Sequence, residues 1–281
     1  MDESYIHHNY ARHNDSLYFP DDKLDNAPKP KHKGQRLCII AGILDDGAAG
    51  SKLITTRVFR GGRRQPKDYH AMFDHAYFVD WIKQLMDELD LLGKTGVVIV
   101  MDNASYHKGL PPTTPKGTWK KQDLLEACQR IGVEATAVEY RTVIWAKLQA
   151  YIKENVVPEV VALARSRGYQ VVYTPSYHSY LQPIEYIWAY VKGIVGRQYT
   201  TETTMEDVRR RLDIALGGVP SDVIYRCISH TKKKVSELSA YLVELEAADE
   251  AVNEPALPGE DESSDDEESD DYQSILTDIV V

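Results

Sequence analysis

The sequence predicts an α/β fold in which a mixed β-sheet is flanked by helices. Short apolar runs at 36–46, 51–60 and 97–101 are suited to strands. Longer segments at 69–92 and 183–195 repeat apolar residues every three or four positions, which is the spacing of one helical face. Strands that alternate with helices of this length are typical of a sheet covered by helices.

The first two apolar runs predict a β-hairpin. The run 36–46 ends in the turn signal Asp-Asp-Gly, and 51–60 resumes with β-branched residues. We therefore expect two antiparallel strands. Asp45 and Asp46 are interpreted as residues that make the turn between them.

The next two elements predict a helix that leads into a buried strand. The apolar face of 69–92 is followed by Gly93, a residue that commonly ends helices. The uninterrupted apolar run 97–101 is too short for a helix and predicts a central strand buried on both faces. Asp102 stands where this strand ends.

Residues 108–170 differ in character and are predicted to be an inserted helical element. A Pro-, Thr- and Lys-rich loop runs through Lys121, and helical patterns follow near 122–131 and over 142–167.

The remaining part of the ordered region predicts one more strand and three helices. The run 171–174 reads as a short strand, and Pro183 is suited to the first position of a helix that carries Glu185 in its first turn. Amphipathic helices are expected at 204–216 and 221–246, the second of them with a break near its T-K-K-K segment.

Composition argues against a secreted or membrane protein. The sequence has no apolar run of about 18 residues and no apolar secretory signal at its start, so we expect a soluble intracellular protein without membrane partners. Cys38, Cys128 and Cys227 are odd in number and far apart, which favours neither a disulfide framework nor a C-x-x-C metal site. They are interpreted as reduced, buried packing residues.

The formal net charge of −10 is unevenly distributed. From Asp249 onward there are 13 of the 43 acidic residues and no Lys or Arg, which leaves 30 acidic against 33 basic residues before it. A slightly basic body is compatible with phosphate contacts, and scattered solvated charge is the alternative. The basic clusters are Arg57, Arg60, Arg63, Arg64 and Lys116, Lys120, Lys121.

The last segment, 249–281, is predicted to be a disordered acidic tail. Its Asp, Glu, Ser and Pro residues cannot bury enough apolar surface to offset the entropy of ordering. Its apolar end, Ile279-Val280-Val281, is a candidate for docking on a protein partner, and a plain solubilising tail is the alternative.

Three acidic residues could form a metal site. A strand that ends in Asp102 and a helix that carries Glu185 in its first turn can present both carboxylates at one edge of a sheet, and Asp2 could end a first strand alongside 36–46. Phosphodiester chemistry uses two divalent cations held by carboxylates. Taken singly, each acid has a simpler interpretation, as a turn residue or as a residue that favours the helix dipole.

The residues around these acids form three ordered motif blocks. They are D-E-S-Y-I-H at 2–7, V-M-D-N-A-S-Y-H at 100–107 and T-P-S-Y-H-S-Y-L-Q-P-I-E-Y-I-W-A-Y-V-K at 174–192. The chain resembles, over about 1–200, the catalytic domain of mariner-type transposases of the Asp-Asp-Glu superfamily. The resemblance implies an RNase H-like mixed sheet flanked by helices, with a helical insertion between the second and third carboxylates.

The same resemblance implies a reaction, cofactors, a partner and a cellular location. It implies cleavage at transposon ends and joining to target DNA, with two Mg²⁺ or Mn²⁺ ions as cofactors, double-stranded DNA as partner and the nucleus as location. A homodimer is compatible with the resemblance. A catalytic domain over 1–248 is expected, with the insertion at 108–170 and C-terminal helices at 200–248.

The resemblance also assigns roles to individual residues. By matching position, Asp2, Asp102 and Glu185 would be the catalytic metal ligands. Asn103 and His107 would lie beside the metals or contact DNA, the alternatives being a turn former and a surface histidine, and Tyr177 and His178 would shape the approach to Glu185. Trp188 is interpreted as core packing.

Three features depart from the family pattern. The 82 residues between Asp102 and Glu185 exceed the interval in the family's best-known members. Gln182 stands where the family usually has asparagine. The first aspartate is the second residue, without the family's upstream helix-turn-helix region and most of the first strand, so we expect Asp2 to be poorly held.

Other functions are also compatible with the sequence. A catalytically impaired, transposase-derived protein that binds DNA or chromatin is the main alternative, and an enzyme acting on RNA:DNA hybrids is another. A zinc site formed by His7, His8, His70 and His75 lacks close ligand spacing and cysteine partners, which favours surface histidines.

Overall fold

The computed structural model describes residues 1–10, 33–60, 74–176 and 178–251. The chain divides into two compact units. Unit 1 comprises Met1–Met72, Val100–Asp102 and Tyr173–Val281, and unit 2 comprises Phe73–Ile99 and Asn103–Val172.

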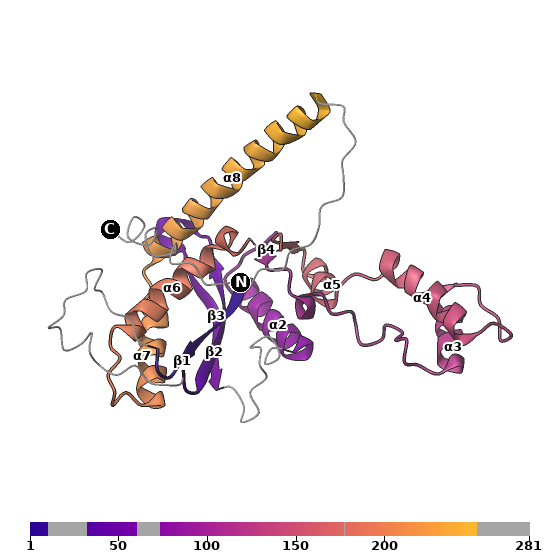
Figure 1. Cartoon of the computed structure of the whole chain (residues 1–281), viewed down its shortest axis with the longest axis horizontal. Helices are drawn as coiled ribbons and strands as arrows, with labels where there is room; N and C mark the ends of the chain where they lie inside the picture. Colours follow the sequence, from indigo (N-terminus) through magenta and orange to yellow (C-terminus); the bar gives the residue numbers. More distant parts are fainter. Residues whose placement is uncertain (11–32, 61–73, 177, 252–281) are drawn as a thin grey trace. The chain divides into compact units, whose positions relative to one another are not determined.

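Unit 1 contains an antiparallel sheet in the order β1-β2-β3 (Figure 1). Its strands are β1 (Asp2–His7), β2 (Arg36–Leu44) and β3 (Lys52–Arg60). The predicted hairpin of β2 and β3 is confirmed, and the short helix α1 (Gly47–Gly50) connects the two strands.

The pairing of β1 with β2 corrects the expectation for Asp2. Asp2 begins β1 instead of ending a strand, and it lies opposite Ala41 in the ladder. The register between β2 and β3 shifts between Ile40 and Gly42, so an irregularity flanks the partner of Asp2. Asp2 is buried, which contradicts the expectation that it would be poorly held.

Three helices pack on this sheet and build the core of unit 1 (Figure 1). They are α6 (Pro183–Gly196), α7 (Met205–Gly217) and α8 (Ser221–Ala251). The predicted face of α6 is confirmed as buried, because its apolar residues recur on one side. That face comprises Ile184, Ile187, Trp188, Val191 and Val195.

The break predicted in the last helix is wrong, because α8 runs without interruption through Lys232, Lys233 and Lys234. Lysine is a good helix former, so the T-K-K-K segment carries no signal that stops a helix. The Lys234 ammonium group donates to the hydroxyl of Tyr186, at 3.2 Å, which ties this turn of α8 to α6.

A second sheet pairs β4 (Val98–Met101) with β5 (Gln170–Tyr173), so both predicted strands are confirmed. The expectation that β4 is buried on both faces is wrong. Ile99 and Met101 are buried, whereas Val98 is 51% and Val100 41% exposed. Successive side chains of a strand point to opposite faces, and only one face of β4 is covered by the described residues.

Unit 2 is helical around the long helix α2 (His75–Leu91). Asp74 caps its start by accepting from the backbone N–H of Tyr77, and Gly93, with φ of 66°, follows its end. The α5 helix (Glu159–Ser166) belongs to the same unit, where the carboxylate of Glu159 lies 3.1 Å from Nε2 of His75.

Two further helices of unit 2, α3 (Lys121–Ile131) and α4 (Arg141–Asn155), share a small core of their own. The single helical stretch predicted over 142–167 is split into α4 and α5. Pro158 lies between them, and a proline lacks the backbone N–H that a helix interior needs.

Several expectations fall outside the described residues. These include the start of the helix predicted from residue 69, the basic residues Arg63 and Arg64, and the acidic tail beyond Ala251. The predicted domain division remains a prediction. All three cysteines are free and buried, as predicted. None of the described helices combines the length and apolar character needed to cross a bilayer.

The start of α7 gives a first test of these local interactions. The hydroxyl of Thr204 accepts from the backbone N–H of Asp207, whose carboxylate accepts from the backbone N–H of Thr204. Replacing Thr204 with alanine should lower the free energy of unfolding by about 1 kcal/mol. Urea denaturation measures this, with the exposed Thr201→Ala as the matched control; equal losses for both variants would contradict the capping role.

Candidate functional site

Asp2 is the most deeply buried of the three predicted carboxylates. It is only 7% exposed, and its Oδ2 accepts a hydrogen bond of 2.9 Å from the indole N–H of Trp188 in α6. Trp188 is itself buried in the core of unit 1. The bond therefore joins the first residue of β1 to a rigidly packed helix.

One hydrogen bond holds the end of β4 beside the start of β1, and a second holds it beside the end of β5. The amine of Met1 donates to the carbonyl oxygen of Val100, at 2.9 Å. The N–H of Thr174 donates to the carbonyl oxygen of Met101, at 2.8 Å. Asp102 is the next residue, so it leaves β4 close to the strand that carries Asp2.

Glu185 is placed by the start of α6, as predicted. Pro183 occupies the first turn, and the backbone N–H of Glu185 donates to the carbonyl oxygen of Gln182, at 3.1 Å. Trp188 follows three residues later, and residues three apart lie on the same face of a helix. The face of α6 that presents Trp188 to Asp2 therefore also carries Glu185.

Gln182, the residue that departs from the family pattern, is buried beside this helix start. Its amide Nε2 donates to the hydroxyl of Thr174, at 3.4 Å. Thr174 follows β5, so the side chain of Gln182 links the entry of α6 to the end of that strand.

The electrostatics of Asp2 agree with this placement. The pKa of its carboxyl lies well above the ordinary value, with burial as the largest cause. The negative charges of Glu185, Glu3 and Asp102 raise this pKa further, in that order. The hydrogen bond from Trp188 acts in the opposite direction. Such mutual repulsion is relieved by a cation, which is the chemistry that a carboxylate metal site requires.

The described residues contain no group of three or more His, Cys, Asp or Glu side chains arranged so that it could hold a metal ion. The charges of Glu185 and Asp102 act on the carboxyl of Asp2, and the role of the three acids as metal ligands remains a prediction. The predicted absence of a histidine zinc site also remains a prediction, since His70 lies outside the described residues.

The other predicted site residues have different surroundings. Asn103 and His107 belong to unit 2, where His107 is completely buried with its ring centroid 4.0 Å from that of Phe78. His107 is therefore not a surface histidine. Tyr177 lies outside the described residues. His178 is half-buried, with its ring 5.3 Å from that of Tyr180.

Two contributors were missed in the sequence. Trp188 was interpreted as core packing, which is confirmed, but its N–H also holds the carboxylate of Asp2. Its position one helical turn after Glu185 was the available signal. Glu3, a second buried carboxylate next to Asp2, also contributes to the negative field.

Comparison with known proteins identifies the family. The family model described as "DDE superfamily endonuclease" matches residues 1–206, a span that includes Asp2, Asp102 and Glu185. No curated protein matches the chain.

Among solved structures, the chain is similar to one described as "Mos1 transposase paired-end complex with left transposon end". The sequences are 14% identical, and the TM-score is 0.46. The match covers 83% of this chain and 51% of that one, so this chain spans about half the length of its structural neighbour. On the strength of the family match, the chain belongs to the DDE superfamily of endonucleases.

Proposed function

We propose that this protein is a metal-dependent polynucleotidyl transferase that cleaves DNA phosphodiester bonds at transposon ends and joins the ends to target DNA. Asp2, Asp102 and Glu185 would hold two Mg²⁺ or Mn²⁺ ions. Membership of the endonuclease family supports the reaction class, since these enzymes generally use divalent metal ions. Double-stranded DNA is the proposed partner and the nucleus the proposed location.

One observation carries this proposal. Two hydrogen bonds, from Met1 to Val100 and from Trp188 to Asp2, bring the start of β1, the end of β4 and the first turns of α6 together. Each of these elements contributes one of the three acids that the family match covers.

The donor chemistry of the three carboxylates suits divalent cations, whereas the described side chains are not gathered into a group that could hold a metal ion. A buried aspartate surrounded by negative charge is unfavourable alone and becomes favourable beside a cation. When bound, two such ions activate the attacking oxygen and stabilise the leaving oxygen of a phosphodiester. The chain's own contribution is to hold the three carboxylates on rigid elements. Trp188 fixes the rotamer of Asp2 through its N–H.

The strand arrangement supports an RNase H-like fold. The hydrogen bond between Met1 and Val100 places β1 beside β4, which pairs with β5. We propose that this contact joins the β1-β2-β3 sheet and the β4-β5 sheet into one mixed sheet, with β1 as its central strand. We further propose that 1–248 form the catalytic domain, with 108–170 as its insertion.

A second candidate function is a catalytically impaired relative that binds DNA or chromatin. It is favoured by one observation, that the described acids do not form an arrangement able to hold a metal. Salt-dependent DNA binding without metal-stimulated cleavage would distinguish this function from the first.

The first test replaces two of the carboxylates without changing their size. With Mg²⁺ or Mn²⁺ and DNA that carries the transposon ends, Asp102→Asn and Glu185→Gln should each lower the cleavage rate at least about 100-fold, because a metal ligand is lost. Gel analysis of cleaved DNA measures the rate. Asp45→Asn is the matched control, because Asp45 pairs with Lys232 at the surface. Equal cleavage by the parent and the two site variants would rule out the assignment.

The second test uses the raised pKa of Asp2. Because this pKa is higher in the folded than in the unfolded state, the folded chain binds more protons, and its stability falls as pH rises from about 4 through the folded-state pKa. In EDTA, Asp2→Asn should therefore be more stable than the parent by roughly 1–3 kcal/mol at pH 8 and by less at pH 4.5.

Urea denaturation at both pH values measures this difference. The exposed Glu202→Gln provides the control, with no such gain. Added Mn²⁺ should stabilise the parent at pH 8 and leave Asp2→Asn nearly unchanged. A gain for Asp2→Asn that is independent of pH would refute the explanation.

The third test concerns Trp188 as a positioning residue. Trp188→Phe keeps an aromatic ring in the core and removes the N–H that holds Asp2, so kcat should fall about 10- to 100-fold with KM for DNA nearly unchanged. The Mn²⁺ concentration needed for half-maximal rate should rise. Trp81→Phe, a buried substitution in unit 2, serves as control. A loss confined to stability, equal in both variants, would show that Trp188 only packs.

A further inference from the structure

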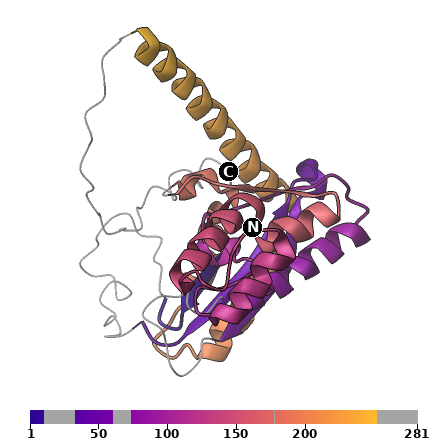
Figure 2. The same cartoon turned by 90° about the vertical axis from the view of Figure 1, so that its right-hand side faces the viewer.

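The segment that follows Asp102 is held by two helices of unit 2. We call Asn103–Gly109 the exit segment, because it leads away from the end of β4, and it contains the 3₁₀ helix η2 (Ser105–Lys108). Both α2 and α5 pack against η2 (Figures 1 and 2). Because Asn103 is bonded to Asp102, contacts that fix the exit segment also restrict the backbone of Asp102.

His75, the first residue of α2, makes the polar part of this contact. Its Nδ1 lies 2.9 Å from the carbonyl oxygen of Tyr106, and its Nε2 lies 3.1 Å from a carboxylate oxygen of Glu159 in α5. A carbonyl oxygen can only accept, so Nδ1 carries a proton and donates the hydrogen bond. The bond between Nε2 and the carboxylate needs a second proton, which makes it charge-assisted. One imidazole ring thus joins the exit segment to α5.

The end of the exit segment lies directly against this ring. The backbone N–H of Glu159 donates to the carbonyl oxygen of Gly109, at 2.9 Å. Gly109 has φ of −55° and ψ of 137°, which residues other than glycine also adopt. A Cβ atom at this position would nevertheless overlap the imidazole of His75. Glycine is therefore required here for close approach and not for its backbone freedom.

Aromatic packing holds the middle of the exit segment. Phe78 follows His75 by three residues in α2, and its ring centroid lies 4.0 Å from that of His107 and 5.9 Å from that of Tyr106. Phe78 and His107 are completely buried. The side chains of His75 and Glu159 are partly shielded from water, with exposed fractions of 28% and 21%. Such shielding strengthens a charge-assisted hydrogen bond.

A second tie between the same two helices does not involve the exit segment. At the far ends of α2 and α5, the guanidinium of Arg167 pairs with Asp87 at 2.6 Å and with Asp90 at 2.8 Å. The two helices are therefore held together independently of His75. What the pair of His75 and Glu159 adds is the contact with the exit segment.

We propose that His75 is a positioning residue, which together with Glu159 and Gly109 clamps the exit segment and thereby holds the backbone of Asp102 as the reaction requires. His75 acts through the exit segment and not by touching the reacting atoms. A displacement of about 1 Å at a reactive group can cost roughly 100-fold in rate, so a clamp at this point has a large effect. The effect on the reaction rests on the proposed function, whereas the clamp itself does not.

Three full-length variants separate the clamp from ordinary helix packing. Glu159→Ala removes the carboxylate that His75 binds. Glu159→Gln keeps a hydrogen-bonding group of the same shape and is the conservative variant. Arg167→Gln is the matched control, because it weakens the other tie between α2 and α5 without touching the exit segment.

Hydrogen exchange, measured by mass spectrometry without metal, tests the clamp directly. Glu159→Ala should accelerate exchange in the peptide that covers the exit segment at least about tenfold, because the segment opens more often. Glu159→Gln and Arg167→Gln should both stay within about threefold of the parent. Exchange that is unchanged in Glu159→Ala would overturn the proposal.

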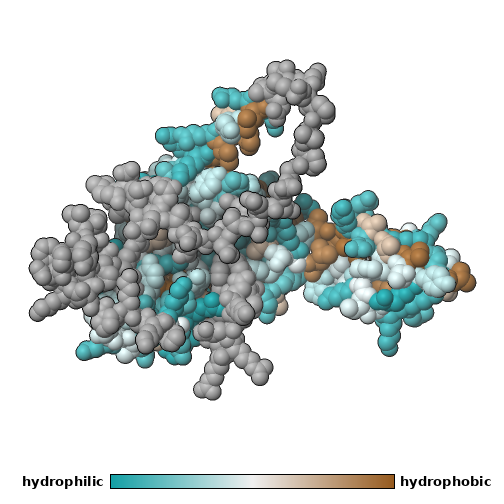
Figure 3. All heavy atoms as spheres, viewed as in Figure 1, coloured by the Kyte–Doolittle hydropathy of each residue, from teal (hydrophilic) through white to brown (hydrophobic). Residues whose placement is uncertain are grey.

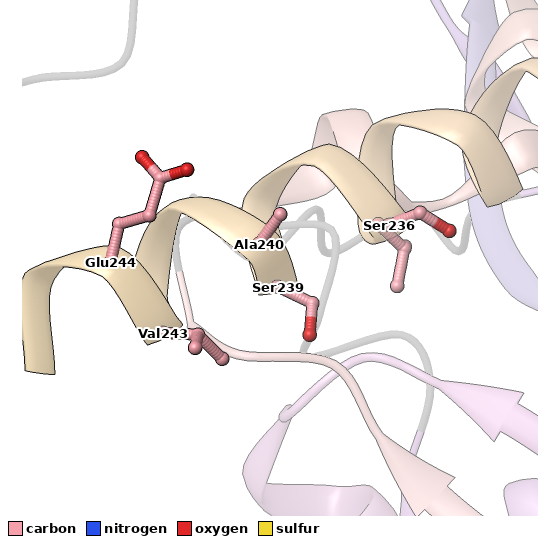
Figure 4. A pocket seen from close by; sticks show the side chains of 6 residues that line it. Ser236, Ser239, Ala240, Val243 and Glu244 are labelled. Atoms are coloured by element: carbon pink, nitrogen blue, oxygen red, sulfur yellow. The ribbon is translucent and has the colours of Figure 1, made fainter. Parts of the chain in front are cut away.

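The outer half of α8, residues 235–246, provides the internal reference for exchange. It extends beyond the other elements of unit 1 in Figure 2, and both hydrophilic and hydrophobic spheres along it are visible in Figure 3. Figure 4 shows Ser236, Ser239 and Glu244 along an open hollow of this helix. Its exchange should be the same in the parent and in all variants, so a global loss of stability would be recognised.

Gly109→Ala tests the close approach of the ring. In the parent background this substitution should accelerate exchange of the exit segment, because the new Cβ displaces His75. In the His75→Ala background it should have little further effect, since the ring that it would overlap is gone. Equal effects in the two backgrounds would show that His75 does not hold the end of the exit segment.

DNA cleavage tests the consequence for the reaction. With Mn²⁺ and DNA that carries the transposon ends, Glu159→Ala should lower kcat at least about fivefold, with KM for DNA within about twofold of the parent. Glu159→Gln should restore most of the rate, and Arg167→Gln should keep it.

Two results would overturn the positioning role. They are an equal fall in kcat for Glu159→Ala and Arg167→Gln, and an exit segment that opens in Glu159→Ala without loss of rate. A parent chain that cleaves no DNA would refute the proposed function instead, and hydrogen exchange would still decide whether the clamp exists.

Discussion

The hydrogen bond from the indole of Trp188 to the carboxylate of Asp2 is the interaction on which the site depends. It joins residues 186 positions apart and fixes the position of β1 relative to α6. Because both residues are buried in the core of unit 1, the same packing that stabilises the fold also orients the carboxylate. Stability and site geometry are therefore linked in this protein.

The region around Asp2 concentrates negative charge, from Glu185, Glu3 and Asp102. Burial of a carboxylate is unfavourable, and the nearby acids add repulsion. A fold normally avoids such an arrangement unless a ligand compensates for it. Unfavourable burial of this kind is typical of sites where binding and stability are coupled.

The sequence was sufficient to predict those features that are encoded by residues close together in the chain. Pro183 and the apolar spacing after it were sufficient to place α6 and Glu185, because a helix start is encoded within a few residues. The contact between Asp2 and Trp188 could not be predicted, because it depends on how distant elements pack. The exposed face of β4 was missed for the same reason, since an apolar run does not show whether both sides are covered. The split at Pro158 had a local signal and was overlooked.

The place of Asp2 inside a ladder, opposite Ala41 and beside the irregularity at Ile40 and Gly42, makes the site sensitive to strand alignment. Successive side chains of β1 face opposite ways, so sliding the strand by one residue would turn Asp2 away and bring Glu3 into its place. The longer glutamate would project its carboxylate about one methylene further, roughly 1.5 Å. Insertions or deletions in the first strand should therefore be far less tolerated than substitutions there.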